Sequence, residues 1–150
     1  MIRDDIKAAL VTAMKARDAS TTATIRLVQA AIKNRDIELR TSSATIDDDA
    51  LVSEVLQKMV KQRRESIDMF TKGGRTELAA TEQTEVDVIE TFLPQMLSEE
   101  ETRAAIESIK AEIGASGVKD MGKVMAELKS RHAGTLDMSK ASGLVKAALA

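Results

Sequence analysis

The sequence predicts an all-α protein, and three observations support this fold class. Apolar residues recur at spacings of three and four through most of the 150 residues, as in amphipathic helices. No segment alternates apolar and polar residues as a half-buried strand does. Proline, which a helix interior does not tolerate, occurs once, at Pro94. We therefore expect two small helical bundles, one on each side of this proline.

The segment around Pro94 contains a stop signal and a restart signal for helices. Proline lacks the backbone N–H that a helix needs, and it keeps the preceding residue out of the helical region. Further on, Ser98 is followed at the third position by Glu101, which is the spacing of a capping box. We therefore predict a four-helix domain at residues 1–94 and a three-helix domain at residues 95–150.

Four helices are expected in the N-terminal domain. Thr21 or Thr22 is expected to cap the second, and Asp47 or Asp48 the third, because short polar side chains accept hydrogen bonds from the first turn. The glycine pair 73–74 should end the third helix, since glycine adopts the left-handed C-cap without steric cost. The expected ranges are residues 3–18, 23–40, 48–72 and 76–93.

Three shorter helices are expected in the C-terminal domain. The first begins after the Ser98 cap and ends before Gly114. Asp120 is expected to cap the second helix, which Gly134 ends, and Ser139 should begin the third. Short connections between three helices of this length give a compact bundle.

The composition limits the compartment and the partners. The formal net charge is −2 and cysteine is absent, so the chain has no disulfide and no thiol chemistry. No apolar run approaches the length of a membrane span, and the first residues carry acids where a signal peptide needs bases. We expect a cytoplasmic location and neither a membrane nor a DNA partner. Phe70 and Phe92 are the only aromatic residues, so bases have no stacking platform and any RNA contact must come from a local basic patch.

The sequence offers few residues for catalysis. It contains no glycine-rich phosphate-binding loop and no nucleophile-elbow motif. His132 is the only histidine and has no second ligand at metal spacing, and residues 47–49 lack the glycine and the distant glutamate of a calcium loop. We therefore assign no catalytic residue, no metal ligand and no cofactor.

One charged residue falls within an apolar stripe. Arg63 occupies the core face of the third helix, where an unpaired guanidinium would be costly. If the fourth helix returns antiparallel through the glycine turn, Arg63 lies opposite Glu85, with Glu82 one turn away. We predict a partly buried ion pair with one of these carboxylates, structural in role, with a binding pocket as the alternative.

Basic residues gather near the C-terminus. Between residues 119 and 146 there are six bases and three acids, a local surplus of three positive charges. Either these side chains only keep the surface soluble, or they form a phosphate-binding patch. The candidate nucleic-acid-binding residues are Lys119, Lys123, Lys129, Arg131, Lys140 and Lys146.

Five short motifs, in order and in spacing, resemble the YqeY family over nearly the whole chain. They are Ala30-Ala31-Ile32-Lys33-Asn34, Lys61-Gln62-Arg63-Arg64-Glu65-Ser66-Ile67, Gly74-Arg75, Phe92-Leu93-Pro94 and Asp120-Met121-Gly122-Lys123-Val124-Met125. The resemblance implies an all-helical, two-domain cytoplasmic protein associated with carbon–nitrogen ligase activity that uses glutamine as the amide donor.

The C-terminal part is also similar to the tail domain of GatB, a subunit of the glutamine-dependent aminoacyl-tRNA amidotransferase. The similar residues run from Gly122-Lys123-Val124-Met125 through Gly134 to Leu144-Val145-Lys146. In GatB this tail contacts transfer RNA, whereas amide transfer occurs in a different domain. GatB tails commonly carry glutamine where Lys123 stands, so this position departs from the pattern.

These observations lead to three functional interpretations. The first is an accessory module that binds transfer RNA, or a transfer-RNA-modifying or aminoacylation enzyme. The second is a helical protein-interaction adaptor that binds no nucleic acid. The third is a stand-alone amidotransferase, which would need a nucleophile to release ammonia from glutamine and a site to activate a carboxylate. The sequence supplies neither in recognisable form.

Overall fold

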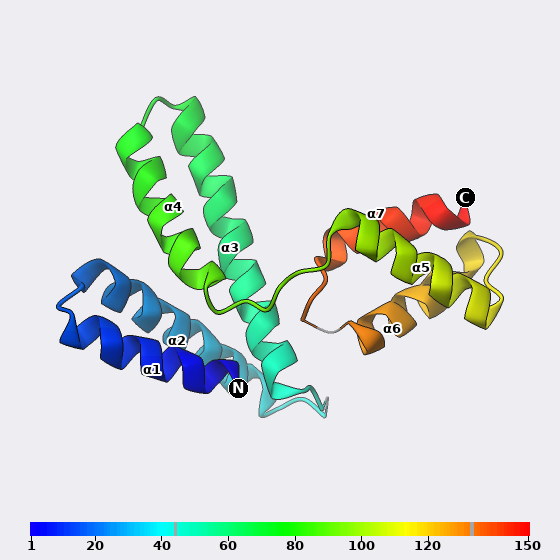
Figure 1. Ribbon diagram of the computed structural model, residues 1–150, viewed down its shortest axis with the longest axis horizontal. Helices are drawn as coiled ribbons and strands as arrows, with labels where there is room; N and C mark the ends of the chain where they lie inside the picture. The colour runs from blue at the N-terminus through cyan, green and yellow to red at the C-terminus, as the bar shows by residue number, and fades with distance from the viewer. Residues whose placement is uncertain (44, 133) are drawn as a thin grey trace. The chain divides into compact units, whose positions relative to one another are not determined.

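The computed structural model describes residues 1–43, 45–132 and 134–150, and the regular structure in these ranges is entirely helical (Figure 1). The all-α prediction is confirmed. Contacts divide the chain into two compact units, the N-terminal unit Met1–Leu93 and the C-terminal unit Pro94–Ala150. Whether these units fold independently, as the domain boundary proposes, stays a prediction.

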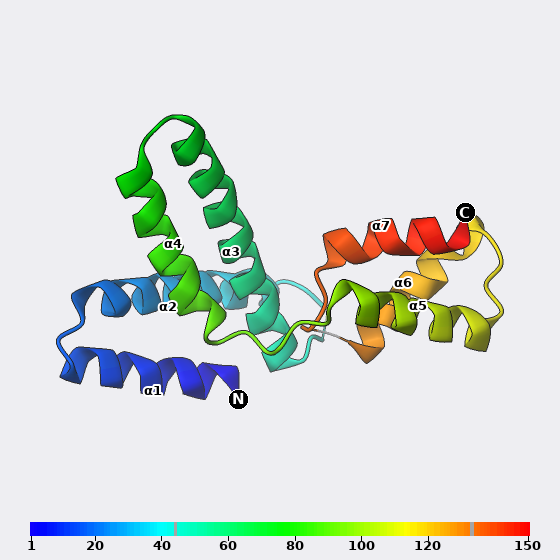
Figure 2. The same cartoon turned by 45° about the horizontal axis from the view of Figure 1, so that its top comes forward.

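The N-terminal unit consists of two helical hairpins. In Figures 1 and 2, α1 runs beside α2, and α3 runs beside α4. The helices are α1 (Ile2–Lys15), α2 (Ala19–Leu39), α3 (Asp48–Lys72) and α4 (Thr76–Glu90).

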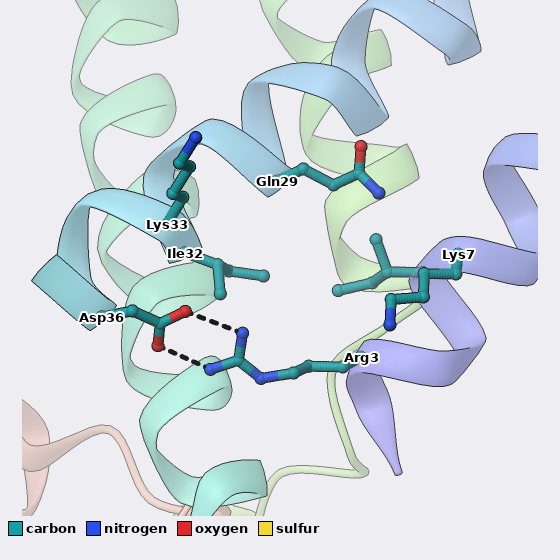
Figure 3. A pocket seen from close by; sticks show the side chains of 7 residues that line it. Arg3, Lys7, Gln29, Ile32, Lys33 and Asp36 are labelled. Atoms are coloured by element: carbon teal, nitrogen blue, oxygen red, sulfur yellow. Dashed lines mark hydrogen bonds and ion pairs between the residues drawn. The ribbon is translucent and has the colours of Figure 1, made fainter.

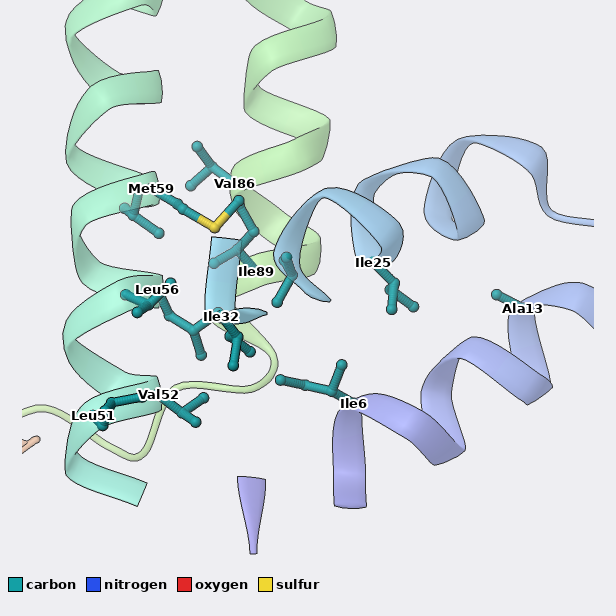
Figure 4. Close-up of a cluster of buried hydrophobic side chains, with 13 residues drawn as sticks. Ile6, Ala13, Ile25, Ile32, Leu51, Val52, Leu56, Met59, Val86 and Ile89 are labelled. Carbon is teal, nitrogen blue, oxygen red and sulfur yellow. The ribbon is translucent and has the colours of Figure 1, made fainter. Parts of the chain in front are cut away.

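All four helices contribute to one apolar core, which Figure 4 shows. At the start of α3 the burial is wider than one stripe, because residues 50–53 are all buried. Its largest fully buried side chains are Ile6 from α1, Ile25 and Val28 from α2, Val52 and Leu56 from α3, and Val86 and Ile89 from α4.

The turn between α1 and α2 differs from the prediction. The N-cap of α2 is Asp18, which accepts a hydrogen bond from the Thr21 N–H at 3.0 Å, so the prediction of a threonine cap is wrong. Arg17 adopts a positive φ of 55° immediately before this cap. The left-handed residue reverses the chain early, so α1 ends at Lys15 and α2 begins at Ala19, four residues before its predicted start.

The hairpin of α3 and α4 forms as predicted from the glycine pair. Asp47 caps α3 by accepting from the Ala50 N–H at 3.1 Å. At the other end, Gly74 takes a φ of 74°, and the Arg75 N–H donates to the Phe70 carbonyl at 2.8 Å. This left-handed turn sends α4 back along α3.

The fourth helix ends earlier than predicted, at Glu90 instead of residue 93. The next three residues form tighter turn bonds, each N–H donating to the carbonyl three residues before it. This geometry lets Phe92 and Leu93 pack against the core of the N-terminal unit.

The C-terminal unit is a bundle of three helices with one short 3₁₀ turn. It has an apolar core of its own, and the side chains that form this core include Val124, Leu128, Ala141 and Val145. The elements are α5 (Glu99–Ile113), η1 (Val118–Asp120), α6 (Met121–Arg131) and α7 (Met138–Leu149).

The predicted capping box at the start of α5 is confirmed. The Ser98 hydroxyl accepts from the Glu101 N–H at 3.1 Å, and the Glu101 carboxylate accepts from the Ser98 N–H at 2.8 Å. Reciprocal bonds of this kind satisfy two backbone donors that the helix leaves free.

Two other predicted helix starts are wrong in detail. The Asp120 carboxylate accepts from the Ser116 N–H at 3.1 Å and so fixes the preceding loop, while α6 has no side-chain cap bond. Helix α7 is capped by Asp137, one position before Met138, because the Asp137 carboxylate accepts from the Ser139 N–H at 3.0 Å. In each case the aspartate carboxylate accepts from backbone N–H groups close to it in the chain, and the spacing of the residues did not predict which ones.

We expect limited proteolysis to cleave first at residues 94–96. Leu93 packs on the N-terminal core and the Leu97 N–H donates to the Thr135 carbonyl at 2.9 Å, so the chain passes from one unit to the other between these residues, where it forms no regular helix. A broad-specificity protease followed by mass spectrometry measures this. First cuts inside α3 or α5 would contradict the boundary.

Candidate functional site

The six predicted nucleic-acid-binding side chains are all exposed on the C-terminal unit. They are carried by the three elements that follow α5. Lys119 lies in η1, Lys123, Lys129 and Arg131 lie on α6, and Lys140 and Lys146 lie on α7.

Arg131 differs from the other five because it is held by two carboxylates. Its guanidinium bonds Glu112 of α5 at 2.5 Å and Glu127 of α6 at 3.2 Å. The hydrogen bond with Glu112 is the main cause that raises the pKa of Arg131, and it lowers the pKa of Glu112. Arg131 therefore braces α6 against α5, and its charge is largely matched within the unit.

Lys119 and Lys123 lie on either side of Asp120. The Ser116 N–H bond lowers the pKa of this aspartate most, and the positive charges of the two lysines lower it further. The two lysines thus share one small region of the surface. Neither forms an ion pair within the described part of the chain, and the same holds for Lys129, Lys140 and Lys146.

Charge is separated within the C-terminal unit. The helix α5 carries five acids and two bases, whereas residues 119–146 carry six bases and three acids. Exposed, unmatched ammonium groups of this kind can contact phosphates without aromatic side chains, and such contacts weaken as salt rises. The chemistry available to this surface is therefore electrostatic anion binding.

A groove of about 680 Å³ in the C-terminal unit was not predicted from the sequence. Leu97, Ala141 and Leu144 contribute apolar surface to it, and Lys140 lies among its polar lining residues. Gly143 also lines the groove, and a Cβ at this position would meet no atom within 4 Å. A glycine inside a helix lowers its stability by about 1 kcal/mol relative to alanine. Gly143, inside the third helix of this unit, was therefore the feature of the sequence that could have indicated an open site there.

A smaller cavity, of about 210 Å³, lies between α1 and α2 in the N-terminal unit (Figure 3). Arg3 closes one side of it by donating to both Asp36 carboxylate oxygens, at 2.9 and 2.7 Å. The same guanidinium donates to Asp48 at the start of α3 at 2.8 Å. These bonds raise the pKa of Arg3, and the hydrogen bond from Arg3 lowers the pKa of Asp36. This network was also missed, because its members are 33 and 45 residues apart.

The predicted contact of Arg63 is present in the α3–α4 hairpin. Its Nε donates to the Glu85 carboxylate at 2.9 Å, and Glu82 lies at 4.0 Å. The Arg63 side chain is 15% exposed and that of Glu85 is 24% exposed, so the pair is partly buried. Arg63 also donates to the Met59 carbonyl at 3.3 Å. Within the described ranges, the hydrogen bonds and ion pairs of this guanidinium are all with its own hairpin, which favours a structural role over a pocket.

Within the described ranges, no group of acidic or histidine side chains could hold a metal ion. No described helix is both long and apolar enough to cross a membrane.

Comparison with known proteins gives one family. A family model described as Yqey-like protein matches residues 3–149. Among curated relatives, "Altered inheritance of mitochondria protein 41, mitochondrial" from Eremothecium gossypii is 36% identical over 82% of this chain and 67% of its own length. The protein of the same name from Saccharomyces cerevisiae is 30% identical over 85% of this chain and 68% of its own length. The Lachancea thermotolerans protein of that name is 28% identical over 97% and 77%.

The expected cytoplasmic location is contradicted by these relatives, whose names call them mitochondrial. The prediction was based on composition, on the absence of cysteine and on the first residues of the sequence. A helical protein without thiols can have the same composition in either compartment, so these features do not distinguish them.

Replacing Arg63 with alanine should lower the free energy of unfolding by about 1–3 kcal/mol. The change removes a partly buried pair and leaves Glu85 without its donor, but solvent screens part of the effect. Urea unfolding measures the change. Arg64→Ala is the matched control, because Arg64 pairs with Glu90 on the same hairpin while 58% of its side chain is exposed. Equal effects of the two substitutions would contradict a special role for Arg63.

Replacing Asp36 with asparagine should lower the free energy of unfolding at neutral pH by about 1 kcal/mol, since its pair with Arg3 is partly exposed. The folded-state pKa of Asp36 is below its ordinary value of about 3.9, so the pair stabilises the fold above that pH and is lost as the pH falls through the lowered value. The difference between parent and D36N should therefore shrink in acid. D68N, at an i,i+4 pair with Lys72 whose side chains are both well exposed, is the control and should change the free energy of unfolding at neutral pH by less than D36N does.

Proposed function

The chain belongs to the Yqey-like protein family, and from this premise we propose that it is an accessory module that binds transfer RNA or a transfer-RNA enzyme. The contact surface is the basic face defined by Lys119, Lys123, Lys129, Lys140 and Lys146. Its task is to hold the RNA beside an enzyme that forms carbon–nitrogen bonds with glutamine as the amide donor.

One observation carries this proposal. Five lysines on η1, α6 and α7 are exposed and form no ion pair among the described residues, while most acids of the same unit lie on α5. Exposed, unmatched lysines gathered on three neighbouring elements of a small bundle attract a polyanion, although the whole chain has a net charge of −2. Arg131 contributes by positioning α6, since its own charge is matched.

The resemblance to the GatB tail that the sequence motifs of residues 122–146 suggest would favour the same partner. Those tails commonly carry glutamine where this chain has Lys123, and this difference changes the kind of contact. An ammonium group binds phosphate as a point charge, whereas an amide recognises a particular hydrogen-bonding partner. Binding through Lys123 should therefore depend on charge more than on RNA sequence.

The other two interpretations are distinguished by experiment. A stand-alone amidotransferase would release ammonia from glutamine when purified alone, and the sequence has no cysteine to serve as the nucleophile. A protein-interaction adaptor would show no affinity for transfer RNA at low salt.

Reversing the charges of Lys119 and Lys123 should weaken binding of bulk transfer RNA about tenfold or more at low salt. The slope of log K against log salt concentration should also fall by about one for each phosphate that the variant no longer neutralises. Fluorescence anisotropy with labelled transfer RNA, over a series of salt concentrations, measures both quantities.

The matched control is K7E/K15E, which makes the same change in net charge on α1 of the N-terminal unit. It should leave the salt slope of the parent unchanged. If K119E/K123E binds transfer RNA with the same affinity and the same salt slope as K7E/K15E, the basic face serves only to keep the protein soluble.

A further inference from the structure

The helix α2 carries a second stripe of residues that are exposed and lie outside the apolar core of the N-terminal unit. Its buried side chains, Ile25, Val28 and Ile32, face the core of the N-terminal unit. On the face turned away from that core, Leu27 is 49% exposed and Ile37 is 46% exposed. Large apolar side chains aligned on an open helix face mark an interaction surface more often than scattered ones do.

The stripe has the spacing of a coiled coil. Its five residues are spaced at intervals of four, three, four and three. In a coiled-coil heptad this spacing places Leu27 and Asn34 at a positions and the other three, Ala23, Ala30 and Ile37, at d positions. All five are exposed. The residues of this seam are Ala23, Leu27, Ala30, Asn34 and Ile37.

We propose that this α2 seam binds a second copy of the chain, forming a parallel two-fold dimer. The charges beside the seam select the partner. Lys33 is at a g position and Glu38 at the following e position, so in a parallel pair each lysine faces the glutamate of the other copy, twice by symmetry. Glu38 also pairs with Arg35 of its own helix at 3.0 Å, but its side chain is 65% exposed and keeps room for a second cation. Lys33 has no ion pair within the described chain, and Figure 3 shows its side chain extending away from the Arg3–Asp36 pair.

The antiparallel arrangement is disfavoured by the same residues. It would bring the g positions of the two copies together, and these are Arg26, Lys33 and Arg40, all basic. Like charges held face to face repel, and no acidic residue at these g positions offsets the repulsion.

Asn34 gives a second, independent reason for the parallel arrangement. Its side-chain amide has no hydrogen-bond partner among the described residues. In a parallel dimer Asn34 meets Asn34 of the other copy and the two amides bond each other, whereas an antiparallel seam would place it against alanine or isoleucine. A single asparagine at an a position is a known means of fixing register and a two-stranded state.

The first test is the molar mass in solution. Sedimentation equilibrium of the full chain between about 1 µM and 1 mM, the range in which weak interfaces dissociate, should show a monomer–dimer equilibrium. L27E should weaken the dimer about a hundredfold or more, because two buried leucines are removed per dimer. V11E, at a position of α1 that is 50% exposed and outside the seam, should leave it unchanged. A parent that is monomeric throughout, or a dimer that survives L27E, overturns the proposal.

Charge exchange and cross-linking test the register and the orientation. K33E and E38K should each weaken the dimer, and the double variant K33E/E38K should restore it. The chain has no cysteine, so N34C or A30C introduces a single thiol. A parallel seam predicts that each variant forms a disulfide dimer with itself. Cross-linking only between N34C and A30C, an a position against a d position, would show an antiparallel pair and overturn the proposed arrangement.

Discussion

The guanidinium of Arg3 connects three helices of the N-terminal unit and, together with their shared apolar core, constrains how they are arranged. It binds Asp36 near the end of α2 through two parallel hydrogen bonds and also reaches Asp48 at the start of α3. The backbone N–H of Ile2 adds a bond to Asp49 at 3.0 Å. Only a planar group with five donors can meet two carboxylates in this way, so lysine could not replace arginine here. With α1 held at its first turn, Ile6 enters the common core and the cavity of Figure 3 remains between α1 and α2.

The three arginine clusters built around Arg3, Arg63 and Arg131 serve the same purpose in different settings. Arg63 joins the two helices of one hairpin, Arg3 joins helices from both hairpins, and Arg131 joins α5 to α6. In each cluster an arginine meets two acids, and the charge is largely matched inside the fold. The lysines are different: those of η1, α6 and α7, like Lys33 on α2, are exposed to solvent without an ion pair in the described chain. These exposed lysines, unlike the three paired arginines, leave positive charge available for partners on η1, α6, α7 and α2.

The two surfaces proposed for binding lie on different units and use different forces. The basic face of the C-terminal unit depends on long-range charge and is sensitive to salt. The α2 seam of the N-terminal unit depends mainly on apolar burial, with charges that determine the partner and its direction. A dimer formed through α2 would carry two basic faces, and two linked contacts with RNA would bind more tightly than one.

Much of the fold follows from the sequence alone, because its signals act within about four residues. The helix period, the Ser98–Glu101 capping box and the Gly74 turn are local, and all are present. The contact of Arg63 with Glu85 was also predictable, since a short turn fixes the register of neighbouring helices. Where several polar residues compete for the same donors, as Asp18 did with Thr21 and Thr22, spacing could not choose between them. The Arg3 network, the pairing of Arg131 and the C-terminal groove required the tertiary structure, because they join residues that only the packing of separate helices brings together.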